Sequence, residues 1–353
     1  MAEINLMGVG HSYGGDAYAL EKADLRLEDG KTYALLGPSG CGKTTMLNII
    51  SGLIYPSDGR VVLGGKDVTR VKTAARNIAQ VFQFPVVYQS KTVFENLAFP
   101  LRCRNWESAR IRARVNEVAE LLGLTSRLHM SSRRLTADEK QLISLGRGLV
   151  RDDVAALLMD EPLTVIDPQM KFELRRKIKQ ANDQTRHTVI YVTHDQNEAM
   201  TFADEIVVMK AGRVIQRGTP QELFEKPYDT YVGNFIGSPG MNFIGVERHG
   251  DRLMLGEIEV LAGARVSALP ASGKFTIGIR PEHLAFEASS GCSIPAWLVS
   301  VQDHGKIRVL ELALATSHIK MKIARDVSFP GTDIRVFFSP DRIRLYADGI
   351  FVN

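Results

Sequence analysis

A stretch of eight residues, GPSGCGKT at positions 37–44, combines glycines, a lysine and a hydroxyl group in the spacing of a phosphate-binding loop. The glycines let backbone N–H groups point at phosphate oxygens, and a following helix adds the dipole of its N-terminus. We expect Lys43 to place a cation on the β and γ phosphates and the Thr44 hydroxyl to ligate Mg²⁺. The loop needs a strand before it and a helix after it, and YALLG and TTMLNIISGL supply them. The predicted nucleotide contacts here are Gly37, Pro38, Ser39, Gly40, Cys41, Gly42, Lys43, Thr44 and Thr45.

A second segment, VAALLMDE at positions 154–161, ends an apolar run in adjacent acids. We interpret Asp160 as the Mg²⁺ ligand and Glu161 as the general base that polarises the attacking water. Apolar strands that end in an acid are common in α/β proteins, so this segment alone does not indicate hydrolysis. Its combination with the phosphate loop does.

The elements that must position these residues alternate between strand-like and helix-like runs. VAALLMD and TVIYVTHD (188–195) are short apolar runs, typical of strands buried on both faces of a parallel sheet. From 105 to 123, apolar residues recur at spacings of three and four, which indicates an amphipathic helix: Ile111, Val115, Val118 and Leu122. Hairpins are predicted at Gly64-Gly65 and around Gly212. Strands alternating with helices predict an α/β domain over 1–235, with a helical subdomain at about 86–150.

The character of the chain changes near residue 236. Short strand-like runs separated by glycine and proline follow, among them FTIGI, AWLVSV, IRVLELAL and IRVFF. No long helical period is visible in this part of the sequence. We therefore predict a mostly β domain over 236–353.

Bulk properties set the class of protein. The chain has 353 residues, 44% of them apolar and 24% charged, with a net charge of +4, which is typical of a globular protein of more than one domain. Three cysteines lie far apart, without metal-binding or disulfide spacing. The N-terminal sequence MAEINLMGVG does not resemble a signal peptide, and no run of about 18 apolar residues predicts a membrane span.

With these motifs, the sequence resembles the ATP-binding subunits of ABC transporters, in particular those of carbohydrate importers of the maltose type. The resemblance implies a P-loop ATPase domain with a mostly parallel sheet, followed by a regulatory OB-like β domain, and the cofactors ATP and Mg²⁺. The segment GIRPEHL (278–284) is similar to a signature of that regulatory domain. OB folds also bind nucleic acid, but residues 240–353 hold 13 basic and 12 acidic residues, a net of +1. We expect no nucleic-acid partner.

The resemblance assigns further site residues. Tyr13 corresponds to the aromatic residue that stacks on adenine; the alternative is a surface tyrosine near a hairpin, and the spacing in the family favours stacking. Gln83 corresponds to a glutamine that contacts Mg²⁺ and water, where the sequence alone suggests only a polar strand end. Asp167 corresponds to a loop that reaches the partner ATPase, and it also fits the N-cap of a helix that begins at Pro168. His194 corresponds to a histidine that bonds the γ-phosphate.

One segment departs from the family. The family signature is Leu-Ser-Gly-Gly-Gln, and this chain has Leu135, Thr136, Ala137, Asp138 and Glu139 in its place. Gln141, Gly146 and Arg147 match the residues that follow the signature, so the alignment is secure. In the family this segment binds the γ-phosphate of ATP held by the opposite subunit. Thr136-x-x-Glu139 still forms a capping box, so we expect a helix that starts normally but repels phosphate.

These features predict an ATPase subunit that energises the uptake of a sugar, a polyol such as glycerol, or glycerol phosphate. We expect it to pair with a second ABC ATPase as a heterodimer and to bind two transmembrane permease subunits, supplied by a solute-binding protein. The expected location is the cytoplasmic face of the inner membrane, as a peripheral subunit. The alternatives are a regulatory subunit that binds ATP without hydrolysis, and a soluble ABC ATPase outside transport. A single cassette without heptads disfavours the latter.

Overall fold

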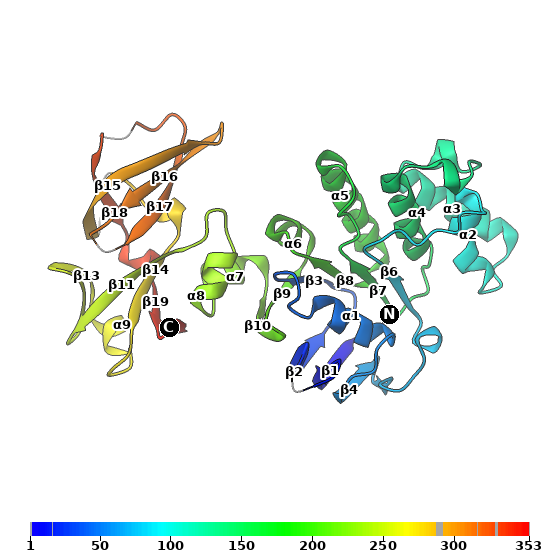
Figure 1. Cartoon of the computed structure of the whole chain (residues 1–353), viewed down its shortest axis with the longest axis horizontal. Coiled ribbons are helices and arrows are strands. Elements are labelled where there is room, and N and C mark those ends of the chain that lie inside the picture. The colour runs from blue at the N-terminus through cyan, green and yellow to red at the C-terminus, as the bar shows by residue number, and fades with distance from the viewer. Residues whose placement is uncertain (1, 16, 287–291, 316, 329–330, 353) are drawn as a thin grey trace. The chain divides into compact units, whose positions relative to one another are not determined.

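The computed structural model describes residues 2–15, 17–286, 292–315, 317–328 and 331–352, and the chain divides into two compact units after Pro220 (Figure 1). The first unit is an α/β domain and the second consists mostly of β-strands. Both classes of structure agree with the sequence analysis, because the change in periodicity near residue 236 reflects a real change in architecture.

The central sheet of the first unit has the strand order β10-β9-β3-β8-β7-β6. Its strands are β3 (Thr32–Leu36), β6 (Ile78–Val81), β7 (Ala156–Asp160), β8 (Thr188–Thr193), β9 (Glu205–Lys210) and β10 (Arg213–Gly218). β10 is antiparallel and the others pair in parallel. Every residue of β3, β7 and β8 is buried, as expected for strands covered on both faces. Their carboxyl ends therefore meet at one edge of the sheet.

An antiparallel sheet with the order β2-β1-β4-β5 covers the other side of α1 (Lys43–Ser51). Its strands are β1 (Ile4–His11), β2 (Leu20–Leu27), β4 (Asp58–Leu63) and β5 (Lys66–Asp67). The hairpins predicted at Gly64-Gly65 and around Gly212 are confirmed, and both central residues of each turn have positive φ. Positive φ at both positions matches the twist of the paired strands.

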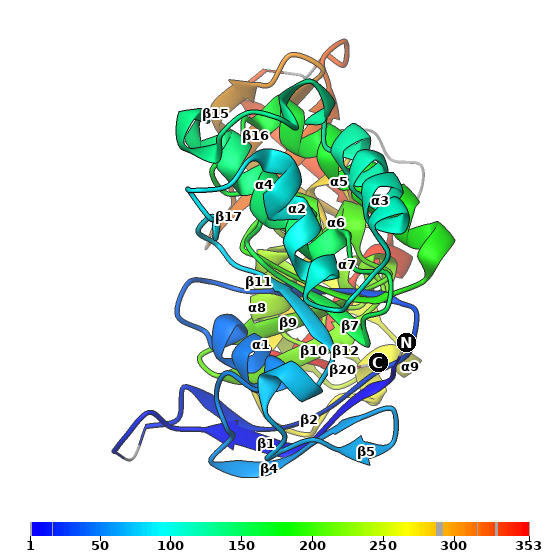
Figure 2. The ribbon, with the colours of Figure 1, turned by 90° about the vertical axis from the view of Figure 1, so that its right-hand side faces the viewer.

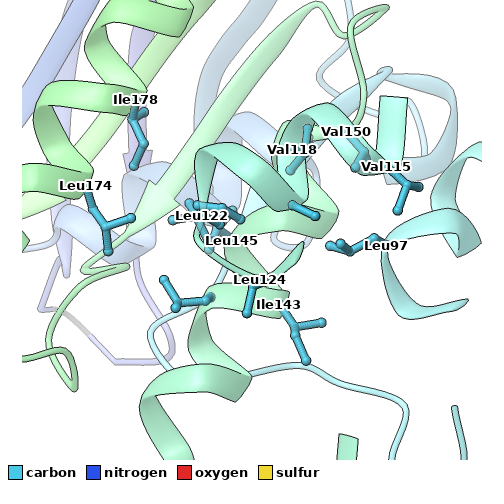
Figure 3. Close-up of a cluster of buried hydrophobic side chains, with 14 of the residues drawn as sticks. Leu97, Val115, Val118, Leu122, Leu124, Ile143, Leu145, Val150, Leu174 and Ile178 are labelled. Atoms are coloured by element: carbon cyan, nitrogen blue, oxygen red, sulfur yellow. The ribbon is translucent and has the colours of Figure 1, made fainter. Parts of the chain in front are cut away.

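The helices predicted between 86 and 150 form a separate group within the first unit, away from the β1-β2-β4 sheet (Figure 2). They are α2 (Val93–Arg102), α3 (Ser108–Leu121) and α4 (Ala137–Leu149). The apolar residues predicted for the core face of α3 are buried, and they pack against Leu97, Leu145 and Val150 (Figure 3). Leu174 and Ile178 of α5 (Pro168–Thr185) join the same cluster, so this core extends to the helix that follows β7. Another helix of the first unit, α6 (Gln196–Phe202), follows β8.

The second unit begins with α7 (Pro220–Glu225) and α8 (Thr230–Phe235). Antiparallel strands follow in sheets of order β13-β12-β11-β14-β19-β20 and β17-β16-β15-β18. They are β11 (Asn242–His249), β12 (Arg252–Leu255), β13 (Ile258–Ala262), β14 (Phe275–Ile279), β15 (Cys292–Asp303), β16 (Ile307–Ala313), β17 (His318–Ala324), β18 (Asp333–Phe338), β19 (Arg344–Ala347) and β20 (Ile350–Val352), with α9 (Ala264–Ser267) after β13. One apolar core joins both sheets.

The structure places residues 221–235 in the second unit, whereas the sequence analysis put them in the first domain. Arg280 explains the difference. It is 2% exposed, and its guanidinium donates hydrogen bonds to the carbonyl oxygens of Phe224 (2.7 Å), Gly233 (3.0 Å) and Ile236. This side chain attaches α7 and α8 to β14, a long-range contact with no signal in local composition.

Candidate active site

The phosphate loop runs between β3 and α1, and its conformation requires glycine. Gly42 caps α1 with a φ of 98°, and Gly40 has a φ of 78°, both in the region that favours glycine. A Cβ at Gly37 would lie 2.4 Å from the carbonyl oxygen of Met209, and one at Gly42 would lie 2.6 Å from that of Ala19. The glycines therefore let the loop pass close to neighbouring backbone while the N–H groups at the start of α1 stay available for an anion.

Lys43 is held inside this loop. Its side chain is 5% exposed, and Nζ donates hydrogen bonds to the carbonyl oxygens of Gly37 (2.8 Å) and Pro38 (2.9 Å). A buried ammonium group beside free backbone N–H groups makes this end of α1 strongly attractive to an anion. The arrangement agrees with the predicted contact to phosphate.

Thr44 and Asp160 meet at the carboxyl edge of the sheet. The Thr44 hydroxyl donates to Oδ1 of Asp160 at 3.2 Å. Asp160 is 6% exposed, and burial raises the pKa of its carboxyl group above the ordinary value. Within the described ranges, no three His, Cys, Asp or Glu side chains form a metal-binding group. A single carboxylate and a hydroxyl fit Mg²⁺, which takes few protein ligands and fills its shell with phosphate oxygens and water.

Glu161 and His194 also come together, from the ends of β7 and β8. His194 Nδ1 lies 3.2 Å from Glu161 Oε1. The backbone of Glu161 has a φ of 43°, and its N–H donates to the carbonyl oxygen of Val192 at 3.1 Å. A non-glycine residue in this region is strained, and such strain is found where a side chain must be aimed in one direction. The Glu161 side chain is mostly buried, whereas the His194 ring is 58% exposed and accessible to a ligand.

Gln83 and Tyr13 lie near this edge. Gln83 is half-buried and follows β6, whose Val81 is opposite Met159 of β7, so Gln83 and Asp160 follow neighbouring strands at the same edge. Tyr13 is 66% exposed, and its hydroxyl lies 3.1 Å from the Thr45 hydroxyl at the start of α1. An exposed ring next to the phosphate loop is the geometry that stacking on a base requires.

Asp167 is the N-cap of α5. Its carboxylate accepts the backbone N–H of Gln169 at 2.9 Å, and Pro168 occupies the first helical position. The helix-capping interpretation of this residue is therefore confirmed. Its proposed contact with a partner ATPase stays a prediction.

The segment from Leu135 to Glu139 opens α4 as the capping pattern predicts. The Thr136 N–H donates to Glu139 Oε2 at 3.0 Å, and Glu139 also forms an ion pair with Arg127. The Thr136 hydroxyl donates to the carboxylate of Asp138, and this bond is the main reason that the pKa of Asp138 is lowered. The structure distinguishes the two acids, because Glu139 has a cation partner and Asp138 remains an ionised, half-exposed carboxylate at the start of the helix.

Gln141 is a structural link that the sequence analysis used only to align the motif. It is fully buried, and its amide Nε2 donates to the carbonyl oxygens of Phe82 (3.2 Å) and Pro162 (2.8 Å). Phe82 directly precedes Gln83, and Pro162 directly follows Glu161. Gln141 thus connects α4 to the segments that carry Gln83 and Glu161. Only its polar type on an otherwise apolar helix face could have indicated this.

Comparisons with known proteins agree with this geometry. The family model for ABC transporters matches residues 20–164, and the model for the MalK OB fold domain matches residues 237–284. The chain is 38% identical to the sn-glycerol-3-phosphate import ATP-binding protein UgpC 3 of Agrobacterium fabrum over 347 residues, which are 98% of this chain and 93% of the relative. It is 41% identical to UgpC of Cereibacter sphaeroides over 80% of this chain and 79% of the relative. It is 32% identical to the sulfoquinovosyl glycerol transport ATP-binding protein SmoE of Agrobacterium fabrum, over 98% of both.

Solved structures resemble the first unit. CbiO1 of Clostridium perfringens, part of an ABC transporter complex, superposes with a TM-score of 0.58 at 25% identity, over 63% of this chain and 90% of that one. A dimeric ATP-binding cassette bound to ADP and phosphate superposes with a TM-score of 0.57 at 26% identity, over 62% and 98%. In the part of the chain that the structure describes, no helix is long and apolar enough to cross a membrane. The chain belongs to the ABC transporter family, as an ATPase subunit of the importer type that carries a MalK-type OB domain.

Proposed function

We propose that this chain hydrolyses ATP at the edge where β3, β7 and β8 end, and that hydrolysis drives solute import from the cytoplasmic face of the inner membrane. The contact between Glu161 and His194 carries the proposal, because it sets a carboxylate and an imidazole next to the Thr44–Asp160 pair. Lys43 neutralises phosphate charge and Tyr13 stacks on the base. Thr44, Asp160 and Gln83 would hold Mg²⁺, which would stabilise the negative charge of the phosphates.

Glu161 is the general base in this proposal. Its mostly buried carboxylate, aimed by a strained backbone, polarises the attacking water, while His194 donates a hydrogen bond to the γ-phosphate. The exposure of the His194 ring supports this role, since the ring must reach a ligand. A pair poised in this way favours a hydrolysing subunit over one that only binds ATP.

We infer the class of cargo from the relatives. UgpC proteins are named for the import of sn-glycerol-3-phosphate and SmoE for the transport of sulfoquinovosyl glycerol. A shared glycerol moiety supports a sugar, a polyol such as glycerol, or glycerol phosphate as the solute. The cargo is delivered by a solute-binding protein and crosses through two permease subunits, to which this chain binds.

The start of α4 supports an asymmetric ATPase pair. At ~4 Å and an effective dielectric constant near 20, a carboxylate repels a phosphate charge by roughly 4 kcal/mol before relaxation. Asp138 carries that charge, and the Thr136 hydroxyl already donates to it. The segment therefore offers the nucleotide of a facing subunit a negative charge and an occupied hydroxyl. We propose that the partner is a second ATPase with an unaltered signature, so that one nucleotide site of the heterodimer is competent.

The hydrolysis proposal is tested with Glu161→Gln in the purified importer complex. Gln keeps the size of the side chain and removes the base, so ATP turnover and solute uptake should fall by at least ~100-fold while ATP still binds. Glu173→Gln, on the exposed face of α5, is the matched control and should leave turnover unchanged. Persistent turnover in Glu161→Gln would show that another group is the base.

The heterodimer is tested by the composition of the complex. Purification through a tag on this chain should recover a second, different ATPase in equal amount, together with the permease subunits. A complex that contains this chain twice, and that turns over ATP at two equivalent sites, would overturn the asymmetric pair and leave the hydrolysis proposal intact.

A further inference from the structure

A buried carboxylate contacts Thr193, the residue that precedes His194. Glu198 of α6 is 8% exposed. Its Oε2 accepts hydrogen bonds from the hydroxyl groups of Tyr191 and Thr193, both at 3.0 Å, and its Oε1 accepts one from Arg175 at 2.9 Å. Neither Glu198 nor Arg175 belongs to the motifs that predicted the active site.

Thr193 connects this carboxylate to the backbone on both sides of His194. Its hydroxyl donates to Glu198 and accepts the backbone N–H of Asp195 at 3.0 Å. A hydroxyl that donates and accepts at once is fixed in rotation. The residues before and after His194 are thus held by the same buried oxygen, and the ring they carry lies 3.2 Å from Glu161.

Arg175 connects the same carboxylate to another helix. It lies on α5, whose N-cap is Asp167. The Arg175 and Glu198 side chains are 13% and 10% exposed, so the pair is largely removed from water. When one member of such a pair is removed, the other is left as an uncompensated buried charge. The position of α5 and the position of the His194 turn are therefore coupled through one ion pair.

We propose that Glu198 is a positioning residue for ATP hydrolysis, which sets His194 against Glu161 and transmits movements of α5 to that contact through Arg175. The inference rests on the proposed role of His194. Glu198 does not touch the nucleotide in this scheme. It acts by orienting the imidazole, so its loss lowers the rate of hydrolysis and leaves ATP affinity unchanged.

A double-mutant cycle separates positioning from general stabilisation of the fold. His194→Ala, Glu198→Gln and the double variant are compared in the purified importer complex, with kcat and KM for ATP as readouts and Glu173→Gln as the control. We expect His194→Ala to lower kcat by ~100-fold or more. Glu198→Gln should lower kcat by about tenfold with KM within ~twofold. The double variant should match His194→Ala within ~twofold, because the removed ring can no longer be mispositioned.

The outcomes distinguish the inference from the function it rests on. If His194→Ala turns over ATP at the normal rate, the role of His194 is wrong and the inference falls with it. If His194→Ala is impaired and Glu198→Gln lowers kcat by the same factor in both backgrounds, Glu198 acts independently and only the inference falls. A rise in KM without loss of kcat in Glu198→Gln also overturns it.

Variants of Thr193 leave the buried Arg175–Glu198 ion pair in place, and variants of Arg175 test the connection to α5. Thr193→Val keeps the shape and removes the hydroxyl, and we expect a loss of kcat of about fivefold that Thr193→Ser restores. Arg175→Ala should lower kcat, whereas Arg176→Ala, its exposed neighbour on α5, should not. Normal turnover in Thr193→Val would overturn the proposal even if Glu198→Gln fails to fold.

Discussion

Two helix N-termini in the first unit contrast in what they offer an anion. At the start of α1, glycines and the buried Lys43 leave backbone N–H groups beside a positive charge. At the start of α4, a comparable helix end carries Asp138, whose carboxylate already holds the Thr136 hydroxyl. Both helices begin normally, and Thr136 and Glu139 keep the capping arrangement. The requirements for starting a helix and for binding phosphate are therefore separable, because Thr136 and Glu139 complete the capping box while Asp138 next to them adds a negative charge.

The largest effect is expected from removal of the Lys43 cation at the start of α1. Lys43→Ala should weaken ATP binding by at least ~100-fold, since a charge-assisted contact in a buried position is lost and the loop carbonyl groups lose their partner. Binding is measured by calorimetry on the full chain, with exposed Lys72→Ala as the matched control. Equal affinity in Lys43→Ala and the wild type would remove the contrast between the two helix ends.

A smaller effect is expected when the start of α4 is changed so that it no longer repels phosphate. The double variant Ala137→Gly/Asp138→Gly removes the carboxylate and lets the backbone approach, so the site that this segment forms with a facing ATPase should bind nucleotide about tenfold more tightly. Asp138→Asn removes only the charge and should give an intermediate gain of ~threefold. Bound nucleotide per importer complex is measured, and Asp183→Asn on α5 is the control. A result in which Asp138→Asn changes nothing would show that charge is not what weakens this site.

The buried carboxylate of Asp160 should destabilise the folded protein at neutral pH. Its pKa is raised by burial, so the folded protein takes up a proton there more readily than the unfolded chain. The ionised carboxylate of Asp160 therefore lowers the free energy of unfolding. This destabilisation is absent below the pKa that Asp160 has in the unfolded chain, and it is fully present above its pKa in the folded protein. Asp160→Asn should abolish turnover yet increase the free energy of unfolding at pH 7, without nucleotide, by roughly 1 kcal/mol. Denaturant titrations across pH should show that this gain disappears in acid, and a gain that is independent of pH would contradict the explanation.

The smallest effects are expected at Glu139, where two variants distinguish its capping hydrogen bond from its ion pair with Arg127. Glu139→Ala removes the acceptor of the Thr136 N–H and the partner of Arg127, and should lower the free energy of unfolding by about 1 kcal/mol. Glu139→Gln keeps the acceptor and loses the ion pair, at a cost of only ~0.3 kcal/mol, since Arg127 is partly exposed. Equal losses would mean that the ion pair and not the cap determines how this helix begins.

Local patterns were the most predictable part of the molecule. The phosphate loop, the apolar strands ending in Asp160 and His194, the hairpin glycines and the capping residues each depend on neighbours within a few positions. In such cases, residue type and spacing alone determine which backbone groups can be satisfied. The buried face of α3 followed from its helical period for the same reason.

Contacts between distant segments could not be predicted in this way. Glu139 pairs with Arg127 of a preceding turn, and Gln141 joins α4 to the segments that carry Gln83 and Glu161. Arg280 holds α7 and α8 in the second unit. No spacing rule links these residues, because their proximity depends on how whole elements pack.

By itself, the sequence predicted the chemistry: a phosphate loop, Asp160 as a metal-binding acid, Glu161 as a general base, and a signature segment whose charge should repel phosphate. Only the tertiary structure decided which charges are compensated and which side chains hold the reacting groups in place. The physical reason is that the pKa of Asp160, the ion pair of Glu139 and the placement of His194 depend on burial and on partners brought from elsewhere in the chain. Those partners are selected by packing, which local residue order does not specify.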